Sequence, residues 1–207
     1  MKKMFLLASV FAVASLSAQV IVSFNFNTAL GNEPSYSADF IETSLVSSAS
    51  ISRGTGLTPA SGAGSFNSSG FTLAGLDLTD YYSITLTPKV GASLSLSGVF
   101  FDGRRSSTGP TSWEVFSSFD GFASTLASGT MPNDAVTHSF AVPLTGFEGI
   151  TDTLEFRIHA FGSASGAGTW RLDNILVPEP HEWGMIAGIG LLGVAFIQRV
   201  RRTQSPA

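Results

Sequence analysis

The sequence predicts an all-β protein built as an antiparallel β-sandwich, and three observations lead to this fold class. Apolar residues alternate with small polar ones in several short segments, and a period of two places one side of a strand in a core and the other in water. Only 13% of the 207 residues are charged, while glycine and serine are abundant, a composition that suits strands and tight turns better than helices. No segment between residues 19 and 180 keeps a helical period over three turns.

Residues 19–177 are expected to form this sandwich as one domain, because roughly 160 residues can bury about 70% of their unfolded surface. About eight to ten strands separated by turn signals favour a jelly-roll-like sandwich. The segments with the clearest strand patterns, in chain order, are residues 22–26, 82–87, 92–97, 112–116, 136–142, 154–160 and 169–177.

Turn signals divide these segments. Asp102-Gly103 and Asp120-Gly121 are dipeptides typical of hairpin turns, because glycine accepts a positive φ without a Cβ clash. Residues 53–69 and 162–168 are rich in glycine, serine and alanine and are expected to form loops.

The first 18 residues have the composition of a secretory signal peptide. Lys2 and Lys3 supply a positive start, residues 4–16 form an apolar run, and small residues before Gln19 offer a cleavage site. The alternative is an N-terminal membrane anchor, although the run is shorter than the roughly 20 residues that span a bilayer. We expect residues 1–18 to be removed on export.

The end of the chain combines a rigid polar motif with an apolar segment. Pro178, Glu179 and Pro180 come first, and the apolar residues 183–197 follow. As a helix, those 15 residues would extend about 22 Å at 1.5 Å per residue, which is short for a bilayer core of about 30 Å. The segment therefore predicts one short transmembrane helix.

A basic tail, residues 198–207, closes the sequence and carries Arg199, Arg201 and Arg202. These arginines would stop transfer and stay on the cytoplasmic side of the membrane. The order of motif, short apolar span and basic tail over residues 178–207 resembles a PEP-CTERM sorting signal. An ordinary single-pass anchor that happens to follow Pro-Glu-Pro is the alternative.

The resemblance implies processing by an exosortase, a membrane enzyme that would cleave near the motif. Cleavage would release or transfer the protein to the cell surface and its exopolysaccharide, so the membrane anchor would be temporary. Proline on both sides of Glu179 blocks helix propagation and presents an extended peptide to such an enzyme.

Charge and cysteine content exclude several functional classes. Residues 19–180 contain 6 basic and 14 acidic side chains, a net charge of −8, which disfavours nucleic acid as a partner. The chain has no cysteine, so it has no disulfide, thiolate metal site or cysteine nucleophile. No cofactor is expected, although oxygen-rich corners of jelly rolls often hold structural calcium and Asp173 is a candidate ligand.

One group of polar residues suggests a glycan site. Asp102, Arg104 and Arg105 precede Trp113, and planar guanidinium and indole faces suit a sugar ring or an acidic glycan. In the alternative, the arginines pair with Asp102 or Glu114 in a hairpin and Trp113 fills the core.

The middle of the chain also resembles domains of bacterial surface proteins that carry such a tail. The resemblance lies in residues 104–113, 120–122 and 170–174, and the Arg-Leu-Asp-Asn of the last segment is similar to the final strand of jelly-roll, carbohydrate-binding-like modules. This resemblance implies a fold without fixing an activity.

No catalytic constellation can be assembled from the sequence. His138 and His159 fall on expected strands, where a solvent-facing role is favoured, and no Gly-x-Ser-x-Gly elbow occurs. Arg157 and Arg171 are expected to form cross-strand ion pairs with Glu155 and Asp173. Carboxylates that could serve glycoside hydrolysis exist, but their spacing selects no pair among Asp102, Glu114, Asp120 and Glu155.

These observations favour an exported protein of the cell surface or its exopolysaccharide, with a non-catalytic structural or carbohydrate-binding sandwich. The alternative is a carbohydrate-active enzyme, similar to a glycoside hydrolase. A third possibility is a matrix component that binds no ligand.

Overall fold

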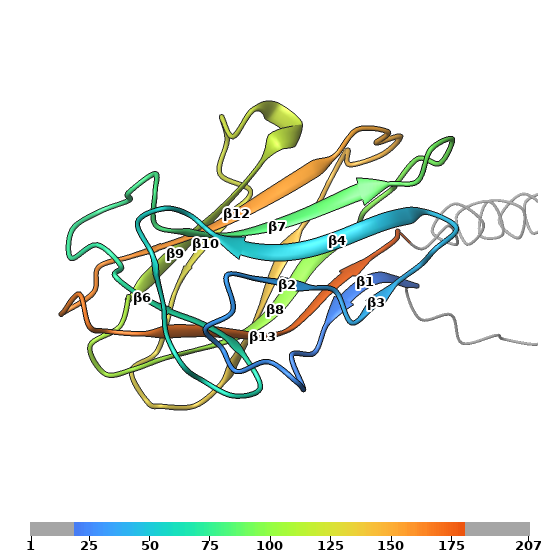
Figure 1. Ribbon diagram of the computed structural model, residues 1–207. Helices are drawn as coiled ribbons and strands as arrows, with labels where there is room; N and C mark the ends of the chain where they lie inside the picture. Colours follow the sequence, from blue (N-terminus) through green and yellow to red (C-terminus); the bar gives the residue numbers. More distant parts are fainter. Residues whose placement is uncertain (1–18, 181–207) are drawn as a thin grey trace, which may run out of the picture. The chain divides into compact units, whose positions relative to one another are not determined.

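Two antiparallel sheets, one stacked on the other, make up the part of the chain that the computed structural model describes, residues 19–180 (Figure 1). The predicted all-β antiparallel sandwich is therefore confirmed, whereas its jelly-roll character stays a prediction. The first sheet has seven strands in the order β11 (His138–Pro143), β8 (Gly98–Arg105), β13 (Trp170–Pro178), β1 (Val20–Phe24) and β3 (Phe40–Ile41), with β6 (Phe66–Ser69) beside β13 and β5 (Thr58–Pro59) beside β6.

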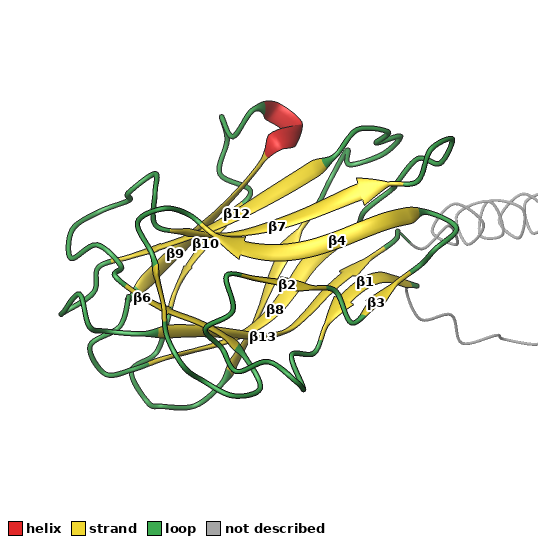
Figure 2. Cartoon of the chain, viewed as in Figure 1, coloured by secondary structure: helices red, strands yellow, loops and turns green. Residues whose placement is uncertain are grey.

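The second sheet has six strands, and Figure 2 shows that strands and loops account for nearly all of the described residues. A single 3-10 turn, η1 (Ser118–Asp120), is the only helical element between residues 19 and 180. The strand order is β10 (Ala127–Thr130), β9 (Ser112–Ser117), β12 (Leu154–Phe161), β7 (Tyr81–Pro88), β4 (Val46–Arg53) and β2 (Ser35–Ser37).

The core lies between the sheets and is unusually rich in aromatic rings. Tyr82 of β7 is fully buried between Phe66 of β6 and Trp170 of β13, with ring centroids 5.8 and 5.7 Å away. Phe101 of β8 continues the series, 6.2 Å from Trp170 and 5.5 Å from Trp113 of β9. Since β7 and β9 belong to one sheet and β6, β8 and β13 to the other, this series of rings joins the two layers.

Side-chain hydrogen bonds also join the two sheets, and one of them lies deep in the core. The Tyr82 hydroxyl, on the six-stranded sheet, donates to the backbone carbonyl of Trp170 on the seven-stranded sheet. Burial raises the pKa of this hydroxyl, so it remains a neutral donor. Because a hydrogen bond is directional, this bond sets both the distance between β7 and β13 and the alignment of Tyr82 with Trp170.

Most predicted strands are present with shifts of one or two residues at their ends. The patterns at 82–87, 112–116 and 154–160 became β7, β9 and β12, and that at 169–177 became β13. The predicted loop at residues 162–168 is also a loop. The described residues hold thirteen strands, more than expected, because several have only two to four residues.

Three local predictions were wrong. Residues 92–97 alternate in polarity but form only an isolated bridge, between Leu94 and Ile150. Asp102-Gly103 is not a turn and lies inside β8, where Gly103 gives room to a core ring: a Cβ there would stand 2.8 Å from the Trp170 indole nitrogen. The segment 53–69, expected to be a loop, contains β5 and β6.

The motif Pro178-Glu179-Pro180 begins inside the seven-stranded sheet. Pro178 ends β13 opposite Val20, and the Glu179 backbone N–H donates to the Gln19 carbonyl at 2.9 Å. Ser97 adds a backbone N–H to the Pro178 carbonyl at 3.0 Å and a hydroxyl to the Glu179 carbonyl at 3.1 Å. The first two motif residues are thus part of the folded body.

The remaining predictions for the termini lie outside the described residues. They concern the signal peptide at 1–18, the apolar segment 183–197, and the tail with Arg199, Arg201 and Arg202. Between residues 19 and 180, no helix is long and apolar enough to cross a bilayer.

The hydrogen bond between Tyr82 and Trp170 predicts a measurable loss of stability. Changing Tyr82 to Phe removes only the hydroxyl and should lower the free energy of unfolding by about 1–2 kcal/mol, because the Trp170 carbonyl loses a buried donor. Thermal unfolding of the full-length chain, followed by circular dichroism in mild detergent, measures the change. Tyr81→Phe is the matched control, since the Tyr81 hydroxyl makes no hydrogen bond within the described residues; an equal loss there would contradict the assignment.

Candidate functional site

The four residues predicted to form a glycan site do not lie together. Trp113 is 4% exposed and packs edge-on against Phe101 and Phe140 in the core. Arg105 is also buried, and its guanidinium donates to the carbonyls of Ser107 and Gly109, at 3.0 and 2.8 Å, in the loop that leads to β9. The structure thus agrees with the alternative in which Trp113 fills the core, and no carboxylate pairs with Arg105.

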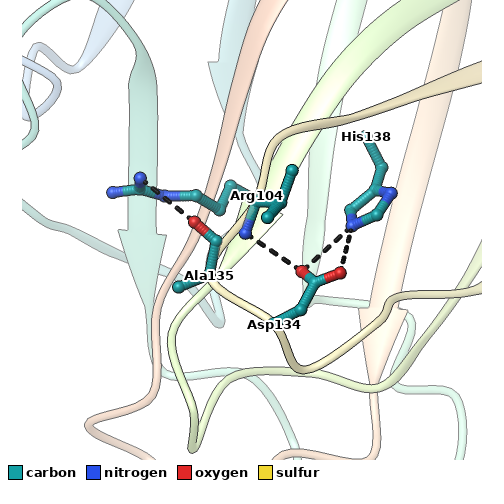
Figure 3. A network of polar contacts seen from close by, with 5 residues as sticks. Arg104, Asp134, Ala135 and His138 are labelled. Atoms are coloured by element: carbon teal, nitrogen blue, oxygen red, sulfur yellow. Dashed lines mark hydrogen bonds and ion pairs between the residues drawn. The ribbon is translucent and has the colours of Figure 1, made fainter.

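Asp102 and Arg104 point the other way, onto the outer face of the seven-stranded sheet. Figure 3 shows Arg104 reaching the loop between β10 and β11, where its guanidinium donates to the Ala135 carbonyl at 3.4 Å. In the same view Asp134 binds the His138 ring at 2.9 Å. Arg104 therefore makes one long hydrogen bond and has no ion pair within the described residues.

A second arginine lies directly opposite the first. Arg171 of β13 is the register partner of Arg104 of β8, and facing residues on neighbouring strands share one side of a sheet. The predicted ion pair between Arg171 and Asp173 does not form, and the Arg171 guanidinium has no hydrogen bond or ion pair among residues 19–180. Burial, and then the charge of Arg104, lower the pKa of Arg171. We call these two residues the arginine pair.

The arginine pair borders a cavity of about 150 Å³. Its floor comes from β8 and β13, and its walls from the loop between β5 and β6 and the loop between β10 and β11. The side chains that line it are all polar or small. The lining residues are Ala63, Gly64, Ser65, Gly103, Arg104, Thr137, Arg171 and Asp173.

A bulge in β13 shapes the next row of the same face. The register between β13 and β8 shifts after Asp173, and Asn174 takes a positive φ of 44°, a conformation that asparagine tolerates better than most residues. The bulge directs the Asn174 amide to the Asp102 carboxylate at 2.9 Å, while Ser139 donates to the other oxygen at 2.6 Å. Burial raises the pKa of Asp173 more than the Asn174 backbone N–H lowers it, and the charge of Asp102 adds to the rise.

Exposed apolar side chains follow the polar groups along the same strands. Phe100 and Leu176 face each other on β8 and β13 and are 39% and 38% exposed. Leu176 is in register with Ser23 of β1, and Ser23 with Phe40 of β3, which is 47% exposed. Phe100, Leu176 and Phe40 are called the apolar row below. The sequence pattern marked the segments that became β1 and β13 but not β8 or β3, and it could not show that this side of the sheet carries exposed apolar residues.

The other candidates lie on the six-stranded sheet. Arg157 pairs with Glu155 at 2.8 Å, as predicted, but along β12 rather than across strands. His159 was expected to face solvent and is instead buried between the Tyr81 and Phe116 rings, with Nδ1 3.0 Å from the Asp77 carbonyl. Burial lowers its pKa, so it is a neutral packing residue.

The four carboxylates considered for hydrolysis are not gathered into one site. Glu114 and Glu155 lie on the six-stranded sheet and Asp102 on the seven-stranded one. Asp120 accepts the backbone N–H groups of Ala123 and Ser124 in the predicted turn, which Gly121 completes with a φ of 71°.

The candidate calcium ligand Asp173 has one acidic neighbour, Asp102, which faces it across β8 and β13. Within residues 19–180, no group of three or more histidine, aspartate or glutamate side chains is placed to hold a metal ion. Both oxygens of neighbouring Asp102 already accept hydrogen bonds, from Ser139 and Asn174.

The position of Trp113 predicts the effect of its removal. Changing Trp113 to Ala should lower the free energy of unfolding by about 3–5 kcal/mol, because it opens a cavity beside Phe101 and Phe140. Arg104→Gln is the comparison, since a surface substitution should change stability by about 0.5 kcal/mol or less. Thermal unfolding of the full-length variants measures both; an unchanged melting temperature for Trp113→Ala would contradict the core assignment.

Comparison with known proteins assigns no family to this chain. No family model matches it, and no curated protein matches it. Among solved structures, it is similar to the K1 cleaved adhesin domain of Lys-gingipain from Porphyromonas gingivalis W83, with 14% identity and a TM-score of 0.42 over 77% of this chain and 98% of that one.

Family 29 carbohydrate binding modules are also similar. A module from Piromyces equi matches with 10% identity and a TM-score of 0.40, over 65% of this chain and 87% of that one. A variant complexed with mannohexaose matches with 13% identity and a TM-score of 0.41, over 78% and 92% of the two chains. At these values the similarity transfers no ligand to this chain.

Proposed function

We propose that residues 19–180 form a non-catalytic, glycan-binding module of an exported cell-surface protein. The observation that carries this proposal is the outer face of the seven-stranded sheet, where β8 and β13 carry both the polar cavity and two residues of the exposed apolar row, Phe100 and Leu176. Sugar rings present apolar C–H faces and polar hydroxyl edges, so they suit a surface on which both kinds of group alternate.

The geometry supports binding along the strands. Phe100 and Arg104 both point outward from β8 and are four residues apart, which corresponds to about 14 Å at ~3.4 Å per residue. Such a face can hold more than one sugar ring, with the apolar row under one ring and the cavity beside the next. Exposed apolar side chains grouped in this way are more typical of a binding face than of an inert surface.

Delivery to the cell surface is the second part of the proposal. The motif at residues 178–180, together with the sequence features on both of its sides, favours export, temporary anchoring and exosortase processing. The exopolysaccharide would then be the polymer that the module meets.

Removal of one aromatic side chain should weaken glycan binding. Phe100→Ala is expected to lower the affinity of the full-length chain for a neutral oligosaccharide such as mannohexaose by about tenfold, because it removes apolar contact area at an exposed position. Isothermal titration calorimetry or a glycan array measures the change. Leu78→Ala, which truncates an exposed apolar residue in the loop between β6 and β7, should bind as the parent does. Binding unaffected by Phe100→Ala would remove the apolar row from the site.

Processing makes a separate prediction. Mass spectrometry of the cell-surface form is expected to find no peptide beyond residues 180–182, because the exosortase would remove the segment that follows the motif. Recovery of residues 199–207 attached to the surface form would contradict this processing.

One observation favours glycoside hydrolysis as a second candidate function. Asp102 and Asp173 face each other on β8 and β13, and the pKa of Asp173 is raised by burial. Two facing carboxyl groups, one of them with a raised pKa, are the arrangement of an acid–base pair. A reducing-sugar assay in the binding experiment decides between the two: released sugar, lost in Asp173→Asn, would favour the hydrolase.

A further inference from the structure

The arginine pair is the most unusual feature of the outer face. The body has 14 acidic and only 6 basic side chains, so an arginine has many carboxylates available to it. Arg157 forms an ion pair with Glu155, whereas Arg104 and Arg171 face each other without an ion pair within the described residues. Like charges directly opposite each other on neighbouring strands are destabilising. A ligand that supplies the missing negative charge would relieve this repulsion.

The charges around the cavity favour an anion. Asp173 is the only acidic residue among those that line the cavity, against two arginines. Both oxygens of Asp102 already accept hydrogen bonds, from Ser139 and Asn174, and Asp134 lies against the His138 ring, so neither carboxylate is directed at the arginine pair. When Asp173 is ionised, the cavity still carries an excess of one positive charge.

The size and the surroundings of the cavity indicate which anion. About 150 Å³ corresponds to roughly five water molecules at ~30 Å³ each, which is room for a carboxylate and the ring atoms next to it. Guanidinium groups bind carboxylates with two parallel hydrogen bonds. The apolar row on the same strands suits the C–H face of the neighbouring sugar rather than a small free anion.

We propose that the arginine pair makes this module selective for acidic polysaccharides, with the carboxylate of a uronic acid residue between Arg104 and Arg171. This inference rests on the proposed glycan-binding function and names its ligand class. In the complex, the two guanidiniums donate to the carboxylate oxygens from opposite strands, and the next sugar lies toward Phe100 and Leu176.

The test compares ligands that differ only in charge. The full-length chain in mild detergent is titrated with a galacturonan hexamer and with the same hexamer after reduction of its carboxyl groups. The charged hexamer should bind at least tenfold more tightly, and Arg171→Gln should abolish this preference, because a charged hydrogen-bond donor is lost. Lys89→Gln removes one positive charge at an exposed position on another part of the molecule and should retain the preference.

Two controls make the result specific. The melting temperature of Arg171→Gln should equal or exceed that of the parent, because a like-charge repulsion is removed; Arg104→Gln provides a second variant of the same pair. Dextran sulfate should bind less tightly than the galacturonan hexamer. Equal binding by dextran sulfate would show attraction to any polyanion and would overturn the carboxylate assignment.

The remaining outcomes separate this inference from the proposed function. If both hexamers bind equally, the module binds glycans but the arginine pair does not select charge, and the inference fails alone. If neither hexamer nor mannohexaose binds, the proposed glycan-binding function fails with it.

Discussion

The contact between aromatic rings of opposite sheets is the interaction on which this molecule depends. With no cysteine in the chain, no disulfide joins the layers, and residues 19–180 hold no group of three or more acidic or histidine side chains that could bind a metal ion between them. Tyr82, Trp170, Phe101 and Trp113 form an unbroken series of ring contacts between the two sheets. Large rings bury much apolar area per residue and prefer offset or edge-on geometry, so they set both the spacing of the sheets and their registration.

This core also explains why the outer face can carry unfavourable features. Three features of this face cost stability. They are the arginine pair, which has no ion pair within the described residues, the bulge with Asn174 at positive φ, and the row of exposed apolar residues. Apart from Phe40 on β3, all of these residues lie on β8 and β13, and both strands send a large aromatic ring inward, Phe101 and Trp170. The strands that hold the candidate site are therefore among those best fixed by the core. A rigid support of this kind allows a binding face to be ordered before the ligand arrives.

The sequence predicted the fold class well, because alternation with a period of two follows directly from packing on one face of a strand. β7, β9 and β12 show it plainly. Local turn rules did less well: Asp102-Gly103 has the composition of a hairpin turn, yet glycine is needed there for the close approach of Trp170. A glycine such as Gly103 is compatible with a turn and with a crowded position inside a strand. Only the tertiary packing shows which of the two structures forms.

The candidate site was predicted only in part, because the sequence does not show which residues of neighbouring strands lie opposite each other. Asp102, Arg104, Arg105 and Trp113 were grouped because they are close in sequence. Arg105 points inward because side chains alternate along β8, and Trp113 points inward because β9 packs that side chain into the core. Arg171 was assigned to an ion pair because Asp173 is close in sequence. Its true neighbour, Arg104, is distant along the chain, and no local pattern records which residues of β8 and β13 face each other.

The backbone contacts at Gln19 and Glu179 have a mechanical consequence. The first residue of the described body and the motif that follows β13 are joined at one corner, where β1 and β13 run antiparallel. Tension applied between these two points would load their hydrogen bonds one after another, as when a zipper opens, rather than all at once. Detachment would therefore start at that corner and would require little force, while the aromatic interior and the strand segments of the candidate site stayed intact.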